Sequence, residues 1–224
     1  MKISIVSATP FEIAPLLSHL ENHGTKKSFY EFEFNNHTII PLVTGIGMVN
    51  TALSLSRFNH TETTDLFLNL GIAGSFSKDF KLGSVVEIVK DRFGDIGVED
   101  ANGQFKDHMD MQWEEEDTYP YKNGWLDNND TKHELGLPKV NGITVNKVHG
   151  AQDSINSIKG KYNAHTESME GAAFMLFCKF NDLTFHQVRS ISNYVEPRNK
   201  DAWEIELAID NLNKTVLEFI KNLS

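Results

Sequence analysis

The chain has 224 residues, and its 31 acidic and 21 basic side chains give a formal net charge of −10. This length fits a single α/β domain, and the acidic balance excludes the broad basic surface that non-specific binding to nucleic acid or to anionic membranes requires. The only cysteine, Cys178, rules out an intrachain disulfide, and no apolar stretch is long enough to span a bilayer, so we expect a soluble, cytoplasmic protein.

Short apolar strand patterns alternate with helical patterns along the chain. Residues 2–8 form an apolar strand pattern, and residues 10–20 repeat apolar side chains at helical spacing. The pair Asn35-Asn36 separates two further strand patterns and predicts a hairpin. Later strands are expected at 66–70, 85–89, 143–148 and 185–192, and helices at 47–57, 169–180 and 203–223. This alternation predicts a three-layer α/β/α fold with a central mixed sheet.

Residues 92–138 interrupt the alternation, because they are polar, rich in Gly, Asn and Asp, and only weakly periodic. A connection of this length in a compact domain is typical of a functional lid or of a disordered excursion. We therefore expect one domain over residues 1–224 with a long loop or lid at about 92–138. Its aromatic side chains would cover a ligand or fill a subunit interface, and the acidic run within 107–117 is typical of a solvated face.

Two polar side chains far apart in sequence each follow a predicted strand. Glu12 comes just after the first strand pattern, and Asn193 ends the last one. In an open α/β sheet, ligands bind at the ends of the strands. A carboxylate at such a position can activate water, and an amide can hydrogen-bond a heterocycle. For Asn193, a turn cap after the strand is the structural alternative.

Glycines and a second carboxylate add to these candidates. The segments 44–47 and 70–75 each contain two glycines after a strand, where the backbone can approach a ligand closely. Neither matches a dinucleotide or phosphate-loop fingerprint, so ordinary turns are the alternative. Glu170 lies among small and apolar neighbours, where an unpaired carboxylate is costly. We expect it either in a buried ion pair or against the hydroxyls of a sugar.

Metal and cofactor chemistry is not expected. The histidines are scattered without the spacing of metal ligands, and the sequence contains no HExxH cluster. A Ser-His-Asp triad is unsupported as well, because no G-x-S-x-G elbow is present.

Five segments in order resemble the nucleoside phosphorylase/nucleosidase family. They are residues 5–13, 44–50, 69–74, 169–172 and 188–193, and they span nearly the whole chain. The resemblance implies a nucleoside phosphorylase-like fold, a nucleoside as the small-molecule substrate, and assembly as a homo-oligomer, a dimer or larger. Within the family, the tail at residues 192–203 is most similar to the futalosine hydrolases of menaquinone biosynthesis.

The resemblance also implies roles for single residues. Glu12 matches the carboxylate that activates water, Glu170 matches the acceptor for the ribose hydroxyls, and Met169 is expected to pack under the ring. Phosphorolytic members carry an Arg and a Ser where this chain has Asn69 and Ile72, which favours water over phosphate as the nucleophile. Nucleosidases often carry a Ser at the latter position too, so the geometry around the attacking water is expected to differ here.

At the base, Ala73 and Gly74 are implied to offer backbone groups. Members that hydrolyse methylthioadenosine carry Asp where this chain has Asn193, and an amide suits a 6-oxopurine better because it donates to O6 or N7. Futalosine also bears a distal carboxylate, for which Arg198 and Arg92 are the candidate partners. The alternatives are another purine nucleosidase (inosine or methylthioadenosine/adenosylhomocysteine type), a phosphorylase, or a non-catalytic nucleoside-binding module.

Overall fold

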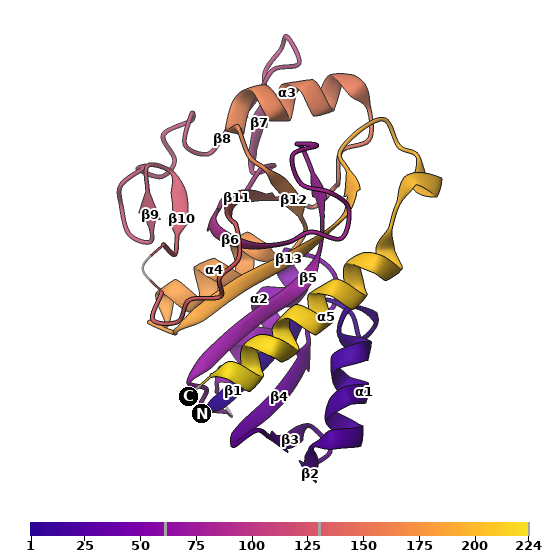
Figure 1. Cartoon of the computed structure of the whole chain (residues 1–224). Helices are drawn as coiled ribbons and strands as arrows, with labels where there is room; N and C mark the ends of the chain where they lie inside the picture. Colours follow the sequence, from indigo (N-terminus) through magenta and orange to yellow (C-terminus); the bar gives the residue numbers. More distant parts are fainter. Residues whose placement is uncertain (61, 130, 224) are drawn as a thin grey trace.

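The computed structural model describes residues 1–60, 62–129 and 131–223, and the two ends of the chain lie close together (Figure 1). The strands are β1 (Lys2–Ser7), β2 (Thr25–Ser28), β3 (Glu31–Phe34), β4 (His37–Val43), β5 (Leu66–Ser75), β6 (Val85–Asp91), β7 (Gly97–Glu99), β8 (Phe105–Asp107), β9 (Tyr121–Lys122), β10 (Trp125–Asp127), β11 (Lys139–Thr144), β12 (Thr166–Ser168) and β13 (Phe185–Tyr194). The helices are α1 (Ala14–His23), α2 (Met48–Asn59), α3 (Gln152–Tyr162), α4 (Gly171–Phe180) and α5 (Ile205–Asn222), with short 3-10 turns η1 (Phe11–Ile13) and η2 (Lys200–Ala202).

Eleven strands of the described chain form one mixed sheet. Its order is β2-β3-β4-β1-β5-β12-β11-β6-β10-β9, and β13 pairs with both β5 and β6. Strands β5, β12, β11, β6 and β13 therefore pair in a closed ring, because β13 returns to β5. Strands β1 to β4 extend the sheet outward from β5. Strands β5 and β13 pair in parallel, so their ends lie side by side.

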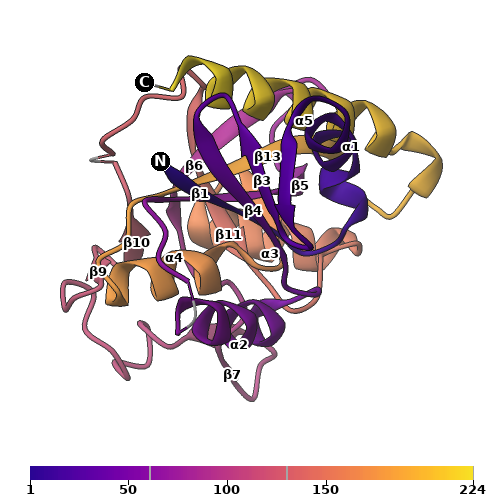
Figure 2. The ribbon, with the colours of Figure 1, turned by 90° about the horizontal axis from the view of Figure 1, so that it is seen from below.

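Helices cover both faces of the sheet (Figure 2). Along β1, Ile3 and Ile5 pack with α1 and α5, whereas Val6 packs with α2 and α4, which is the alternation of a strand that is covered on both sides. On α5, the buried residues recur at helical spacing and include Leu212 and Val216. The predicted three-layer α/β/α fold with a mixed sheet is confirmed. No helix within the described ranges is long and apolar enough to cross a bilayer.

The structure differs from the sequence prediction mainly around α3. The strand expected at 143–148 is β11 at Lys139–Thr144, and neither α3 nor β12 was expected. Helix α3 buries only Ile155, Ile158 and Tyr162 among polar residues, so its apolar face is narrow. These three side chains are buried in a small separate core with parts of β11 and the end of β13. Tertiary contacts therefore stabilise a helix whose own pattern is weak.

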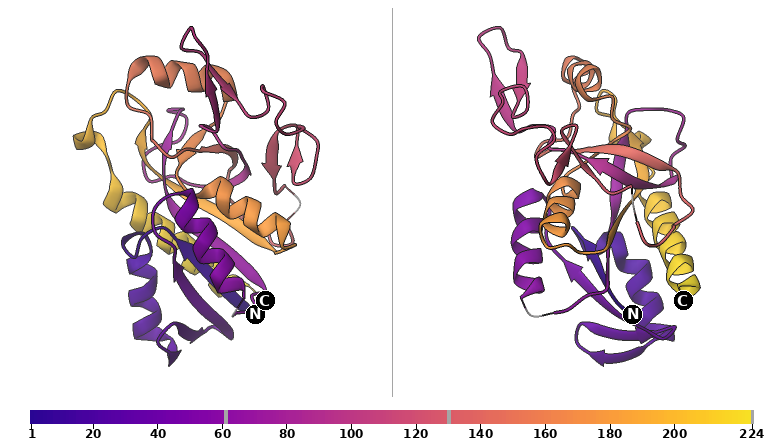
Figure 3. Two further views of the ribbon diagram at one scale, coloured as in Figure 1. Left: turned by 180° about the vertical axis from the view of Figure 1, so that it is seen from behind. Right: turned by 90° about the vertical axis from the view of Figure 1, so that its left-hand side faces the viewer.

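The segment at 92–138 contains β7 to β10 and is anchored on α3 (Figure 3, right). Arg92 donates to Asp107 at 2.9 Å, Tyr162 donates to the same carboxylate at 2.9 Å, and the guanidinium lies 4.6 Å from the Tyr162 ring centroid. Arg92 is thus engaged inside the protein, and its expected contact with the distal carboxylate of a substrate stays an untested prediction. The lid role of this segment stays a prediction. None of its described residues lines the cavity that contains Glu12 and Glu170.

Candidate active site

A cavity of about 400 Å³ lies where β1, β5 and β13 end and α4 begins. The segments that line it follow directly from these strands, as expected for an α/β sheet. Six of the residues singled out from the sequence line it together: Glu12, Ala73, Gly74, Met169, Glu170 and Asn193. The seventh, Arg198, lines an adjoining cavity of about 50 Å³ that shares Gly74 and Asn193 with the larger one. The roles of these residues stay predictions.

The Glu12 carboxylate is held by donors on both oxygens. Oε2 accepts from the Ser7 hydroxyl at 3.2 Å and from the Thr9 N–H and hydroxyl at 3.0 and 2.9 Å. Within the described part of the chain, Oε1 accepts from the Ile72 N–H alone, at 3.2 Å. A side chain at Gly71 would place its Cβ 3.0 Å from Oε1, so glycine there lets β5 approach the carboxylate. Oε1 thus keeps acceptor capacity toward the cavity, and Oε2 fixes the orientation.

The backbone of Glu12 is fixed from the far end of the chain. Asn213 on α5 donates its amide to the Glu12 carbonyl at 2.8 Å and accepts from the Leu16 N–H at 3.1 Å. The side chain is buried, so both bonds are shielded from water. Sequence reasoning missed Asn213. In the sequence, Asn213 could have been noticed as a polar residue on the apolar face of a predicted helix.

Glu170 faces the same cavity from the start of α4. Its Oε1 accepts from the Gly47 N–H at 2.8 Å, and Gly47 adopts a positive φ of 91° that favours glycine. Burial raises the pKa of Glu170 above its usual value, while the Gly47 N–H and the charge of Arg189 partly offset that rise. The predicted alternative, a direct buried ion pair, is not found among the described residues.

Arg189 is the buried cation behind both carboxylates, and sequence reasoning missed it. Its guanidinium donates to the Asn69 side chain at 2.6 Å and to the backbone carbonyls of Asn69 and Val188 at 3.3 and 3.0 Å. Burial lowers the pKa of Arg189, and the negative charges of Glu170 and Glu12 oppose that shift. The positive charge therefore acts on the carboxylates through space. The available signal was an arginine inside an apolar strand pattern.

Asn193 lies inside β13 rather than in a turn cap, so the structural alternative from the sequence is wrong. The pairing of β13 with β5 is irregular at this point, and Gly74 is the register partner of Asn193. The amide oxygen accepts from the Ser192 hydroxyl at 2.9 Å, and Nδ2 donates to the Tyr194 carbonyl at 3.0 Å. Nδ2 carries two N–H donors, so one of them is available to a ligand.

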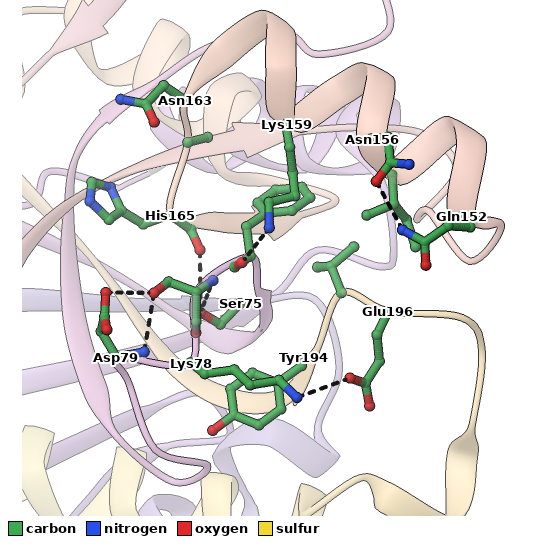
Figure 4. Close-up of a pocket in the computed structure, with 15 residues that line it drawn as sticks. Ser75, Lys78, Asp79, Gln152, Asn156, Lys159, Asn163, His165, Tyr194 and Glu196 are labelled. Carbon is green, nitrogen blue, oxygen red and sulfur yellow. Dashed lines mark hydrogen bonds and ion pairs between the residues drawn. The ribbon is translucent and has the colours of Figure 1, made fainter.

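A larger groove, of about 660 Å³, lies between α3 and the ends of β5 and β13 (Figure 4). Its lysines already have partners in the protein. Lys159 donates to the Phe76 carbonyl at 3.0 Å, and Lys78 lies 3.7 Å from the Glu196 carboxylate. The smaller cavity brings Glu12 and Glu170 together at the ends of three strands, so it is the better candidate for chemistry.

Comparison with known proteins identifies the family of the chain. Residues 2–223 match the family model of the Phosphorylase superfamily. The chain belongs to this superfamily. It is 25% identical over 177 residues to the futalosine hydrolase of Thermus thermophilus, covering 78% of each chain. It is 32% identical over 99 residues to the 5'-methylthioadenosine/S-adenosylhomocysteine nucleosidase of Chromohalobacter salexigens, covering 42% of each chain.

Solved structures extend the comparison over the whole fold. The 5'-methylthioadenosine/S-adenosylhomocysteine nucleosidase of Neisseria meningitidis, in complex with methylthio-immucillin-A, matches with a TM-score of 0.78 at 20% identity and covers 99% of each chain. The futalosine hydrolase of Helicobacter pylori matches with a TM-score of 0.79 at 17% identity, covering 100% of this chain and 98% of that one. The expected fold is thus confirmed, and so is the expected enzyme class, a nucleosidase of the methylthioadenosine/futalosine type.

Proposed function

We propose that the protein hydrolyses the N-glycosidic bond of futalosine and releases hypoxanthine and dehypoxanthine futalosine in menaquinone biosynthesis. The observation that carries the proposal is the amide of Asn193, which lies beside Gly74 on the cavity wall. Its unused N–H can donate to O6 or N7 of a 6-oxopurine, whereas the 6-amino group of adenine presents a donor there. The likeness to a futalosine hydrolase from Thermus thermophilus supports the same substrate.

Glu12 and Glu170 would act at the sugar. Glu170 accepts from the ribose hydroxyls, with Met169 beneath the ring, while Glu12 Oε1 takes a proton from the attacking water. Breaking the bond between C1′ and the base gives the sugar oxocarbenium character, as in glycoside hydrolysis generally. The bonding electrons leave with the base, and the water oxygen then bonds to C1′. General-base assistance of this kind contributes about 10²–10⁴-fold.

Water, rather than phosphate, is the proposed nucleophile. Asn69 is buried and occupied by Arg189 and by the Val6 carbonyl, so it offers nothing to a phosphate. The two terminal nitrogens of Arg189 in turn donate to Asn69 and Val188, and Arg189 does not line the cavity. Without a guanidinium fork at the sugar, a phosphate would lack its strongest contacts.

Arg198 is the proposed partner of the distal carboxylate of futalosine. It lines the smaller adjoining cavity, and its guanidinium stacks 5.2 Å from the Trp203 ring centroid. Among the described residues, no carboxylate forms an ion pair with it, unlike Arg92, which is bound to Asp107. Arg198→Met should therefore raise KM for futalosine and leave KM for inosine unchanged. Because the same cavity is lined by His149 and Asn193, an equal rise in KM for both nucleosides would place Arg198 at the base and refute its role at the distal carboxylate.

The test is base release measured by chromatography from futalosine, inosine and methylthioadenosine, each with and without phosphate. We expect hypoxanthine from futalosine at a rate independent of phosphate, and much slower release from inosine. Adenine release would point instead to a methylthioadenosine nucleosidase, and a requirement for phosphate would rule out hydrolysis. No base from any substrate would favour a non-catalytic binding module.

The exposed apolar residues beside the cavity are the proposed contact surface of the expected homo-oligomer. Phe11 and Ile46 line the cavity and are 59% and 57% exposed, and Val49 and Leu53 continue the patch along α2 at 77% and 58%. Apolar side chains gathered at the rim of a site mark an interaction surface, and a second copy of the chain would cover them. Light scattering should give the mass of a dimer or larger assembly, and a monomeric Leu53→Asp variant would locate the contact.

A further inference from the structure

The proposed reaction leaves one proton unassigned. As the C1′ bond breaks, negative charge develops on the departing base, and protonating that base makes it a better leaving group. Asn193 can donate a hydrogen bond, but an amide gives up no proton near neutral pH. A titratable group on the same wall of the cavity would supply that proton.

Such a group lies across β5 from Asn193. Gly74 on β5 has Asn193 of β13 as its register partner on one side and Glu167 of β12 on the other. Residues paired in register point to the same face of a sheet, and all three line the cavity. The Glu167 carboxylate is buried, and both of its oxygens accept from His149, one from the backbone N–H at 2.9 Å and the other from the ring Nδ1.

This contact leaves the other ring nitrogen of His149 available. A carboxylate is acceptor-only, so Nδ1 carries the hydrogen and Nε2 is the nitrogen that can exchange a proton. Within the described residues, Nε2 has no hydrogen-bond partner. The ring is 13% exposed and lines the 50 Å³ cavity together with Gly74 and Asn193.

We propose that His149, oriented by Glu167, is the proton donor to the leaving base. The inference rests on the proposed function. The acid is the imidazolium form of His149, in which Nδ1–H donates to Glu167 and Nε2 carries a second proton. That Nε2 proton passes to the N7–O6 edge of the purine as the C1′–N9 electron pair moves onto the base, which leaves the neutral Nδ1–H ring. Glu12 takes a proton from the water that bonds to C1′, and solvent returns that proton to His149. The sum is nucleoside plus water giving free base plus sugar, with no other reactant.

The test compares two leaving groups within one variant. His149→Gln keeps a hydrogen-bond donor but gives up the exchangeable proton, so kcat for the purine nucleoside should fall about 10²-fold or more, with KM little changed. Hydrolysis of 4-nitrophenyl riboside, whose phenolate leaves without protonation, should stay near the wild-type rate. If the wild type does not cleave that compound, 7-methylinosine replaces it, because its base is already cationic. A ratio of rates within one preparation is insensitive to any loss of folded protein.

Two further variants complete the design. Glu167→Gln keeps an acceptor for the His149 N–H but lacks the charge, and should cause a smaller loss confined to the purine nucleoside. His23→Gln, on the exposed face of α1, is the matched control and should behave as wild type. Equal losses on both leaving groups, or a His149→Gln variant with more than a tenth of wild-type kcat, would overturn the inference. An inactive wild type would instead count against the proposed function.

Discussion

Replacing Glu12 by Gln tests the proposed base most directly, and the structure predicts two separate effects. The amide oxygen of Gln can take the place of Oε2 and keep its contacts with Ser7 and Thr9. The amide nitrogen then takes the place of Oε1 and faces the Ile72 N–H, which is also a donor. The reverse orientation is worse, because three donors would face the NH2 group.

The magnitudes of the two effects differ. A buried donor left without an acceptor costs about 1–3 kcal/mol of folding free energy, which this fold should tolerate because domains of this kind have about 5–15 kcal/mol. Loss of the base should lower kcat about 10²–10⁴-fold, or about 3–5 kcal/mol of activation free energy. The catalytic loss should therefore far exceed any loss caused by unfolding.

The assay is release of hypoxanthine from futalosine, with urea denaturation of the same preparation. Glu21→Gln, an exposed change on α1, is the control and should alter neither quantity. A folded Glu12→Gln variant that retains a tenth of wild-type kcat would remove Glu12 as the base. A folding loss well above 3 kcal/mol would refute the assignment of hydrogen bonds.

Three further predictions concern the buried polar groups and the base. Arg189→Met should lower the free energy of unfolding in urea by about 3–5 kcal/mol, because Glu12 and Glu170 lose their buried cation; an unchanged midpoint would contradict this. Burial raises the pKa of Asp91 to about 6 from 3.8, so the folded state binds that proton more tightly than the unfolded state. Wild-type stability should therefore fall by about 3 kcal/mol as pH rises from about 4 to about 6, and a pH series of Asp91→Asn should lack that fall. Asn193→Asp should shift kcat/KM from futalosine toward methylthioadenosine. Competition between these two nucleosides measures the preference, and an unchanged ratio would contradict the role of the amide.

The sequence predicted the elements whose periodicity is strong. Strand β5 is mostly apolar, with the buried Asn69 as an interruption, because helices cover both faces of the sheet, and α5 repeats its apolar side chains at helical spacing. Strand β12 spans only Thr166–Ser168, and no pattern can identify three polar residues as a buried strand. Its pairing with β5 and β11 decides its conformation, and that pairing is a property of the closed ring.

The site was predictable in part for the same reason. Glu12 and Asn193 stand at the ends of clear strand patterns, and their neighbours resemble a known family. Asn213 acts on Glu12 across 201 residues of sequence, and no local pattern carries that information. Glu167 holds the ring of His149, which belongs to a loop between β11 and the unexpected helix α3. Residues that position other residues are revealed by the fold rather than by spacing.

Arg189 explains how two acidic side chains can share one cavity. A direct salt bridge would occupy the carboxylate oxygens that the proposed mechanism needs for water and for the ribose hydroxyls. Arg189 instead donates to Asn69 and Val188. Its positive charge lowers the free-energy cost of burying the negative charges of Glu12 and Glu170 without a direct contact. A neutral isostere at position 189 should therefore weaken the fold and catalysis together, because the same buried charge serves both.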